Sequence, residues 1–412
     1  MSEQATKAIL VICDGLGDRP IPELNNRTPL EAASAGPLSE LARRGAIGLM
    51  NTVGVGVRPG SDTSHLALLG YDPHEYYAGR GPIEAAGTGL VLQAGDIAFR
   101  GNMGTTDDDG NIIDRRAGRI ENTEPFMGIL DGKVVDGVTF IARPGTAYRV
   151  ALVMRGKGLS PAISDVDPHD PGVPMKPVVP LDGSQEAIHT ANVLNKYLAL
   201  TRKELLAHPQ NVAKRAQGKL EANYLLLRGA GMYKWMPPFS QRFGLKAACV
   251  AGAGLYKGVA FLMGMDLVEV KGATGMFNTD VRAKFTRALQ LLGEGYDFVF
   301  VHVKAADSLG EDGNWSAKRD FIAKINAAAE VFLDMPANTL LVITADHTTP
   351  CALKAHSGDP VPLLFSGYGV IQDDATEFGE RACRKGGCGR IRGLELMPEI
   401  LNVLGRAHLY GA

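Results

Sequence analysis

The chain has 412 residues and a formal net charge of −2 at pH 7, and its composition, 45% hydrophobic and 21% charged, is typical of a globular protein with room for two domains. No block of like charges and no apolar run near the roughly 18 residues of a membrane helix occur, so we expect neither a nucleic-acid nor a membrane partner. The five scattered cysteines form no C-x-x-C pair and the N-terminus lacks a signal-peptide pattern, which predicts reduced thiols and a cytoplasmic location.

Three apolar runs predict buried strands: residues 7–15, 296–307 and 338–347. The runs are continuous rather than alternating, which is typical of parallel strands covered by helices on both faces. Ahead of the second run, Asn278 and Asp280 can cap a helix over VRAKFTRALQLL, and the strand–helix alternation returns at residues 361–370 and 394–405. The pattern predicts a doubly wound α/β core.

The middle of the chain has a different pattern. Short strands joined by Asp/Gly turns are predicted between residues 96 and 156, followed by a long helical stretch at 185–217 and the strand NYLLLRG. We interpret residues 78–242 as a smaller α+β domain inserted into the core, which is then formed by residues 1–77 and 243–412.

Each of the three buried runs ends at or near a carboxylate: Asp14, Asp307 and Asp346. Because ligands gather at the carboxyl ends of strands in open α/β sheets, we expect these acids to share one edge of the sheet. Three carboxylates so close repel one another unless a cation neutralises them, and His347 and His356 follow nearby in the sequence. This mixture of ligands suits Zn²⁺ or Mn²⁺ better than Ca²⁺. The alternative is that each acid only caps a helix or forms a turn and that the histidines are structural.

The segment PGSDTSHLALLGYDP (59–73) contains two serines but lacks the G-x-S-x-G pattern of serine hydrolases, because Gly60 directly precedes Ser61. A serine without a histidine base can instead be activated by a metal ion.

The chain resembles the archaeal-type 2,3-bisphosphoglycerate-independent phosphoglycerate mutases of the alkaline phosphatase superfamily. The resemblance covers nearly the whole chain and rests on CDGLGD, PGSDTSHLALLGYDP, YYAGRGPIEAAGTGL, DRRAGRI, SDVDPH, VHVKAADSLGEDGN and TADHTTPCALKAHSGDPVP, in the family's order. It implies an alkaline-phosphatase-like core with an inserted domain and a two-step phosphoryl transfer between 3-phosphoglycerate and 2-phosphoglycerate.

The resemblance also implies residue roles. Ser61 is the nucleophile, and two divalent ions are held, one by Asp14, Ser61, Asp346 and His347, the other by Asp307, position 311 and His356. Lys257 matches a lysine close to the nucleophile, and Arg228 matches an arginine of the inserted domain that holds the substrate phosphate. Further expected contacts to the phosphate or the carboxylate are Arg115, Arg116, Arg119 and His169.

Position 311 departs from the superfamily motif D-x-x-x-H, because this chain has Glu311 in place of the histidine. As a ligand, Glu311 would shift the metal preference from Zn²⁺ or Co²⁺ toward the harder Mn²⁺ or Mg²⁺, and we expect Mn²⁺. Alternatively, Glu311 points away and the second site is weak, or Asp312 contributes. The departure leaves open a phosphatase or a mutase acting on another phospho- or phosphonocarboxylate, and a non-catalytic metal-binding homologue remains a third reading.

Overall fold

The computed structural model describes residues 5–168 and 170–411. Contacts between residues divide the chain into two compact units, one formed by the residues up to Tyr77 together with those from Pro237 onward and the other by Ala78–Met236. The first unit resumes at Pro237 and not at the expected residue 243. Phe239 belongs to this unit because it packs against Phe298 with ring centroids 4.9 Å apart and donates its N–H to Met263 O.

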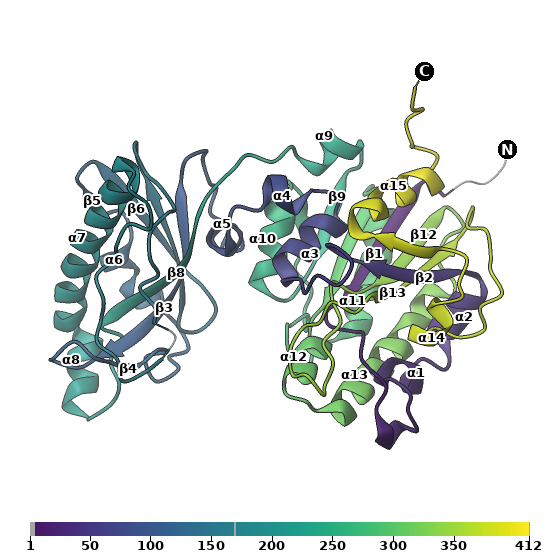
Figure 1. The fold of residues 1–412 in the computed structure, drawn as a ribbon, viewed down its shortest axis with the longest axis horizontal. Coiled ribbons are helices and arrows are strands. Elements are labelled where there is room, and N and C mark those ends of the chain that lie inside the picture. Colours follow the sequence, from purple (N-terminus) through teal and green to yellow (C-terminus); the bar gives the residue numbers. More distant parts are fainter. Residues whose placement is uncertain (1–4, 169, 412) are drawn as a thin grey trace. The chain divides into compact units, whose positions relative to one another are not determined.

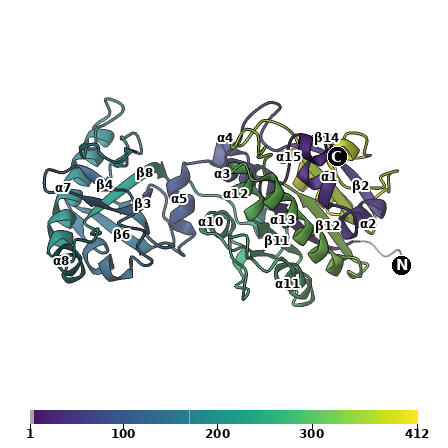
Figure 2. The same cartoon turned by 90° about the horizontal axis from the view of Figure 1, so that it is seen from below.

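Within the described residues, the first unit is built on an eight-stranded sheet (Figures 1 and 2). In spatial order the strands are β10 (Asp266–Leu267), β9 (Ala247–Val250), β11 (Phe298–Val303), β1 (Lys7–Cys13), β12 (Thr339–Thr344), β13 (Val361–Gly367), β2 (Gly45–Asn51) and β14 (Gly389–Arg392). Neighbouring strands are parallel except where β13 pairs with β12 and β2. The predicted α/β class is confirmed.

The main helices of the first unit form two groups. Helices contact others within their own group, as expected if each group covers one face of the sheet (Figures 1 and 2). One group consists of α3 (Ser61–Leu68), α10 (Gly254–Leu262) and α15 (Gly393–Val403). The other consists of α1 (Pro29–Ala33), α2 (Pro37–Arg43), α11 (Val281–Gly293), α12 (Ala305–Glu311), α13 (Trp315–Ala328) and η3 (Ala329–Phe332). The remaining short helices are η1 (Pro22–Leu24), α4 (Pro73–Tyr76), α9 (Phe239–Phe243) and α14 (Glu380–Cys383).

The central strands β1, β11 and β12 are buried on both faces, as their continuous apolar sequences predict. β1 lies between the other two and runs parallel to both, so the carboxyl ends of all three strands meet at one edge. The helix expected after residue 280 is α11, and the Asp280 side chain caps it by accepting the N–H of Ala283 at 2.9 Å.

The second unit contains an antiparallel sheet formed by β4 (Ile112–Asp114), β3 (Ile97–Thr106), β7 (Arg149–Arg155), β6 (Val138–Pro144) and β5 (Val134–Val135), with β8 (Tyr224–Met232) paired to β3. Its strands alternate between two cores: Val150 and Leu152 of β7 join the larger one, whereas Ala151 and Val153 join the smaller one. Helix α7 (Gln185–Ala207) packs on the larger core and α5 (Arg80–Ala86) on the smaller one (Figure 1). The unit also has η2 (Glu124–Phe126), α6 (Met127–Leu130) and α8 (Pro209–Ala216).

The prediction of one continuous helical stretch over residues 185–217 is wrong. The structure has two helices there, because Pro209 provides no N–H and restricts His208 to an extended conformation with φ −64° and ψ 133°. In the part of the chain that the structure describes, no helix is long and apolar enough to span a bilayer.

Candidate active site

Three buried carboxylates lie at the carboxyl ends of the three central strands. Asp14 follows β1 directly, Asp346 follows β12 by two residues, and Asp307 lies in the first turn of α12 after β11. Asp14 and Asp346 are fully buried and Asp307 is 3% exposed. The structure therefore brings together the strand-end acids that the sequence singles out.

The first group of possible metal ligands consists of Asp14, Asp346 and His347. His347 Nε2 lies 3.3 Å from Asp14 Oδ1 and 3.1 Å from Asp346 Oδ2, and both of these buried oxygens lack a hydrogen-bond donor. Their sister oxygens are satisfied: Asp346 Oδ1 accepts two backbone N–H groups, and Asp14 Oδ2 accepts the hydroxyl of Tyr256. Unsatisfied buried oxygens aimed at one imidazole nitrogen are costly without a cation, so these residues fit a bound metal ion.

Ser61 adds a fourth oxygen to this group. It is the first residue of α3, and its Oγ lies 3.1 Å from His347 Nε2. His65, one turn later, directs its Nδ1 to the carbonyl oxygen of Ser61 at 2.6 Å and holds the start of the helix in place. Ser64 is fully buried and pairs with the hydroxyl of Thr52 at 3.1 Å, which is a structural role.

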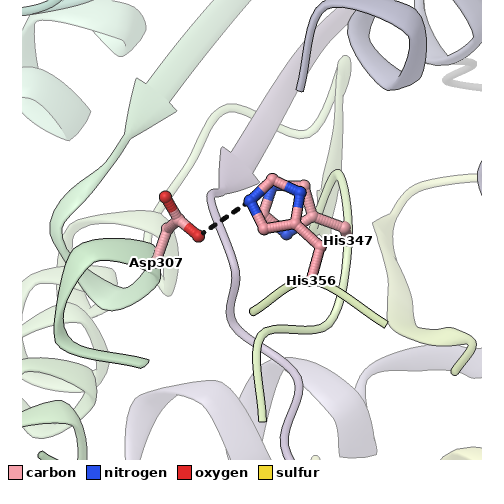
Figure 3. A group of neighbouring side chains, drawn as sticks. All are labelled: Asp307, His347 and His356. Atoms are coloured by element: carbon pink, nitrogen blue, oxygen red, sulfur yellow. Dashed lines mark ion pairs between the residues drawn. The ribbon is translucent and has the colours of Figure 1, made fainter. Parts of the chain in front are cut away.

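The second group consists of Asp307, His347 and His356, shown in Figure 3. His356 Nε2 lies 3.4 Å from Asp307 Oδ1, and the two imidazoles stack with their centroids 3.5 Å apart. His356 Nδ1 faces the carbonyl oxygen of Pro59 at 2.9 Å, which only accepts hydrogen bonds. In neutral His356 the ring proton therefore sits on Nδ1, and Nε2 would be free to bind an ion beside Asp307; without an ion, Nε2 and Asp307 form the ion pair drawn in Figure 3.

Glu311 lies at the edge of the second group rather than within it. Its Oε1 is 3.8 Å from His356 Nε2, and its side chain is 53% exposed. Partial burial and the neighbouring Asp307 raise the pKa of Glu311 above its ordinary value. The i, i+4 spacing on α12 thus turns Glu311 toward the same side as Asp307 without bringing its carboxylate into the close cluster.

Lys304 and the acids determine the charge state of the site. Lys304 Nζ lies 3.3 Å from Asp14 Oδ2 and 3.0 Å from Asp307 Oδ2, one carboxylate from each group. Burial opposes the charge of Asp14, but Lys304 holds the pKa of Asp14 well below its usual range. Burial likewise opposes protonation of His347, yet Asp346 and Asp14 raise the pKa of His347 to about 10. Asp14 is therefore ionised and able to bind a cation.

Comparison with known proteins gives the family. A family model for 2,3-bisphosphoglycerate-independent phosphoglycerate mutase matches residues 42–211. A protein of that name from Methanococcus aeolicus is 45% identical over 408 residues, which cover 98% of this chain and 100% of the relative. This chain belongs to the 2,3-bisphosphoglycerate-independent phosphoglycerate mutase family. A second member, from Methanocaldococcus jannaschii, is 45% identical over 410 residues, covering 98% of this chain and 99% of the relative.

Solved structures of similar proteins share the fold. A protein from Pyrococcus horikoshii superposes with a TM-score of 0.84 at 36% identity, covering 99% of this chain and 100% of the other. The cofactor-independent phosphoglycerate mutase of Thermoplasma acidophilum superposes with a TM-score of 0.75 at 37% identity, covering 97% and 100%. The fold expected from the resemblance to the mutase family is confirmed.

The residues expected to contact the mutase substrate lie in the second unit. Arg115 forms a two-pronged ion pair with Asp167, with both N–O distances 2.7 Å, and Arg228 Nε lies 4.0 Å from the same carboxylate. Arg116 lies over the ring of Tyr148. The structure thus gathers Arg115 and Arg228 around one acid. Arg119 is an exposed residue with φ 59°, and His169 lies outside the described residues.

Lys257, the lysine expected close to the nucleophile, pairs with an exposed glutamate instead of a candidate metal ligand. Lys257 Nζ lies 2.6 Å from Glu269 Oε1, and the Glu269 side chain is 81% exposed. No contact between Lys257 and a candidate metal ligand occurs among the described residues. The ammonium group that contacts Asp14 and Asp307 is that of Lys304.

Lys304, Tyr256 and Thr349 are site residues that the sequence reasoning missed. Thr349 Oγ1 lies 3.0 Å from His347 Nδ1 and 2.9 Å from Asp307 Oδ1. Burial and the Asp14 carboxylate raise the pKa of Tyr256 well above its ordinary value, so its hydroxyl remains a donor to Asp14. Sequence signals existed for Lys304 and Thr349, since each lies within three residues of a candidate ligand. Tyr256 comes from a distant helix and gives no such signal.

Proposed function

We propose that this protein interconverts 3-phosphoglycerate and 2-phosphoglycerate through a phosphoserine at Ser61, without a bisphosphoglycerate primer. Family membership at 45% identity over nearly the whole chain supports the activity. The observation that supports the mechanism most strongly is the position of Ser61 Oγ beside His347 Nε2, next to two buried carboxylate oxygens that lack a donor.

The proposed ligands form two sets. Asp14, Ser61, Asp346 and His347 would hold one divalent ion, and Asp307, Glu311 and His356 the other. Bound ions would lower the pKa of the Ser61 hydroxyl and withdraw negative charge from the phosphoryl oxygens.

The protein's own residues would then carry the phosphoryl group between the two positions of glycerate. Ser61 loses its hydroxyl proton, and its Oγ bonds to phosphorus while the bond from phosphorus to the 3-oxygen of the substrate breaks. The released 3-oxygen takes a proton. Glycerate then presents its 2-hydroxyl, which loses a proton as it bonds to phosphorus, and the bond to Ser61 Oγ breaks. Lys304, already in contact with two ligand carboxylates, adds positive charge where the phosphoryl charge develops.

We assign substrate anion binding to Arg115 and Arg228 of the unit Ala78–Met236, with Arg116, Arg119 and His169 as further candidates. Guanidinium groups bind carboxylates and phosphates in a two-pronged manner, and Arg115 already binds Asp167 in this way. Lys257 is kept as a proposed phosphate contact, because an exposed ion pair such as that with Glu269 is weak enough for an arriving phosphate to displace.

An enolase-coupled assay tests the proposed function. The metal-free protein should be inactive, and 3-phosphoglycerate should be turned over without added 2,3-bisphosphoglycerate once Mn²⁺, Co²⁺, Zn²⁺ or Mg²⁺ is supplied separately. Release of inorganic phosphate without formation of 2-phosphoglycerate would instead support a phosphatase. That second function is kept because Glu311 departs from the family motif and lies outside the close cluster.

Changing Glu311 tests its proposed role as a ligand. A site with two carboxylates and one imidazole favours Mn²⁺, so Glu311→His should move the preference in turnover toward Zn²⁺ or Co²⁺. Glu311→Ala should weaken one of the two metal-binding steps and leave the other unchanged. Isothermal titration of metal-free protein with each ion, together with the coupled assay, measures both effects.

The matched control is Glu330→Ala, which removes an exposed carboxylate paired with Arg282 in the same unit. Its metal affinities should equal those of the wild type. If Glu311→Ala also keeps both affinities and the order of preferred ions, Glu311 does not bind metal.

A further inference from the structure

Thr349 connects the two proposed sets of metal ligands, since its one hydroxyl contacts His347 of the first set and Asp307 of the second. The residue is fully buried, and its Oγ1 lies between His347 Nδ1, at 3.0 Å, and Asp307 Oδ1, at 2.9 Å. His347 lies beside Asp14 and Asp346, whereas Asp307 lies beside His356. A single side chain that is not itself a candidate ligand therefore contacts one member of each proposed ligand set.

The direction of the two hydrogen bonds follows from the chemistry of the groups. The ionised Asp307 carboxylate only accepts, so the single hydroxyl proton of Thr349 is donated to Asp307 Oδ1. Thr349 Oγ1 then accepts a hydrogen bond from His347 Nδ1, which places a ring proton on Nδ1. A metal ion binds the neutral form of His347, and in that form Nε2, the atom that faces Ser61 Oγ and the two carboxylate oxygens, is the nitrogen available to it.

The main chain of Thr349 is held by a buried lysine. Lys318 of α13 is fully buried, and its Nζ donates three hydrogen bonds of 2.9 Å, to Thr349 O, Gly17 O and Asp18 Oδ2. The Thr349 N–H also donates to Gly17 O at 3.2 Å. Lys318 thereby joins the loop after β12 to the loop after β1, which carries Asp14, so the hydroxyl of Thr349 has a defined position.

We propose that Thr349 is a positioning residue that couples the two metal sites, with Lys318 fixing its place. The inference rests on the metal centre proposed above and goes beyond it, because it states that the ions are bound interdependently. Removing the hydroxyl leaves His347 Nδ1 without an acceptor and Asp307 Oδ1 without a donor at the same time. Both binding steps should therefore weaken, although Thr349 is not itself a proposed ligand. Partners that orient metal ligands in this way typically account for about 10–100-fold in metal affinity.

The test compares variants that differ by one hydroxyl. Thr349→Val keeps the shape and removes the hydroxyl, Thr349→Ser keeps the hydroxyl, and Thr348→Val removes the neighbouring hydroxyl, which bonds to Pro360 O at 3.3 Å. Metal-free protein of each variant is titrated with Mn²⁺ by calorimetry, and its circular dichroism melting curve shows whether it is folded. Glu311→Ala is titrated alongside as a variant expected to weaken one step only.

We expect Thr349→Val to weaken both steps by about 10–100-fold, while Thr349→Ser and Thr348→Val bind as the wild type does. Wild-type affinities in Thr349→Val would overturn the proposal, and so would an equal loss in Thr349→Ser, since the hydroxyl would then not be the cause. A loss confined to one step would overturn the coupling. If the wild type binds no Mn²⁺, the metal centre itself is refuted, which is a different result from a failure of Thr349 alone.

Discussion

Replacing Ser61 with alanine is expected to abolish mutase turnover, by roughly four orders of magnitude or more, while the fold remains intact. The substitution removes the atom that accepts the phosphoryl group and one oxygen of the first ligand set. Ser61 is the first residue of α3 and its side chain does not cap the helix, so alanine should be accommodated without loss of stability. The coupled assay measures turnover, and a melting curve measures stability.

Ser64→Ala is the matched control for this experiment. Ser64 lies on the same helix and pairs with Thr52, away from the candidate ligands, so its loss should cost some stability but little turnover. Turnover near the wild-type rate in Ser61→Ala would exclude a phosphoserine mechanism. If Ser64→Ala loses turnover and Ser61→Ala does not, Ser64 is the nucleophile.

Asp14→Asn is expected to cause the second large effect, a loss of metal affinity at the first site that exceeds about a hundredfold, together with loss of turnover. Asp14 Oδ1 is a buried oxygen without a donor, and it faces His347 Nε2 at 3.3 Å. An amide keeps the shape but carries no charge, so it can neither attract a cation nor balance the ammonium of Lys304 in the same way. Calorimetric titration of metal-free protein with Mn²⁺ measures the change.

Asp96→Asn provides the control for burial of an amide. Asp96 is 2% exposed and pairs with Arg155 in the second unit, where it touches no candidate ligand. The Asp96→Asn variant should be less stable than the wild type but should bind metal with the same affinity. Full metal affinity in Asp14→Asn would contradict the assignment of this carboxylate as a ligand.

The sequence predicts the core of the fold and the meeting of the acids for physical reasons. Continuous apolar runs indicate strands buried on both faces, and parallel strands bring their carboxyl ends to one edge, which is where Asp14, Asp307 and Asp346 lie. The adjacent His347 and the loop residue His356 then join the cluster.

Other features depend on packing that sequence patterns do not report. Tyr256 reaches Asp14 from a helix that follows β9, 242 residues away along the chain, and Thr349 acts through the orientation of one hydroxyl. The end of α7 was missed although Pro209 marks it, because the helical pattern continues beyond that residue. Glu311 was found by its spacing, but its half-exposed position is set by the end of α12.

Mass spectrometry of acid-quenched enzyme tests the proposed mechanism most directly. Metal-loaded protein is mixed with 3-phosphoglycerate, quenched over the first turnover and digested, and the peptide containing Ser61 and Ser64 is fragmented to locate any phosphate. The account predicts a phosphate on Ser61 that appears only with metal and substrate, and that is absent from Ser61→Ala. Turnover of substrate with Ser61 unmodified throughout, or with the phosphate on another residue, would contradict it.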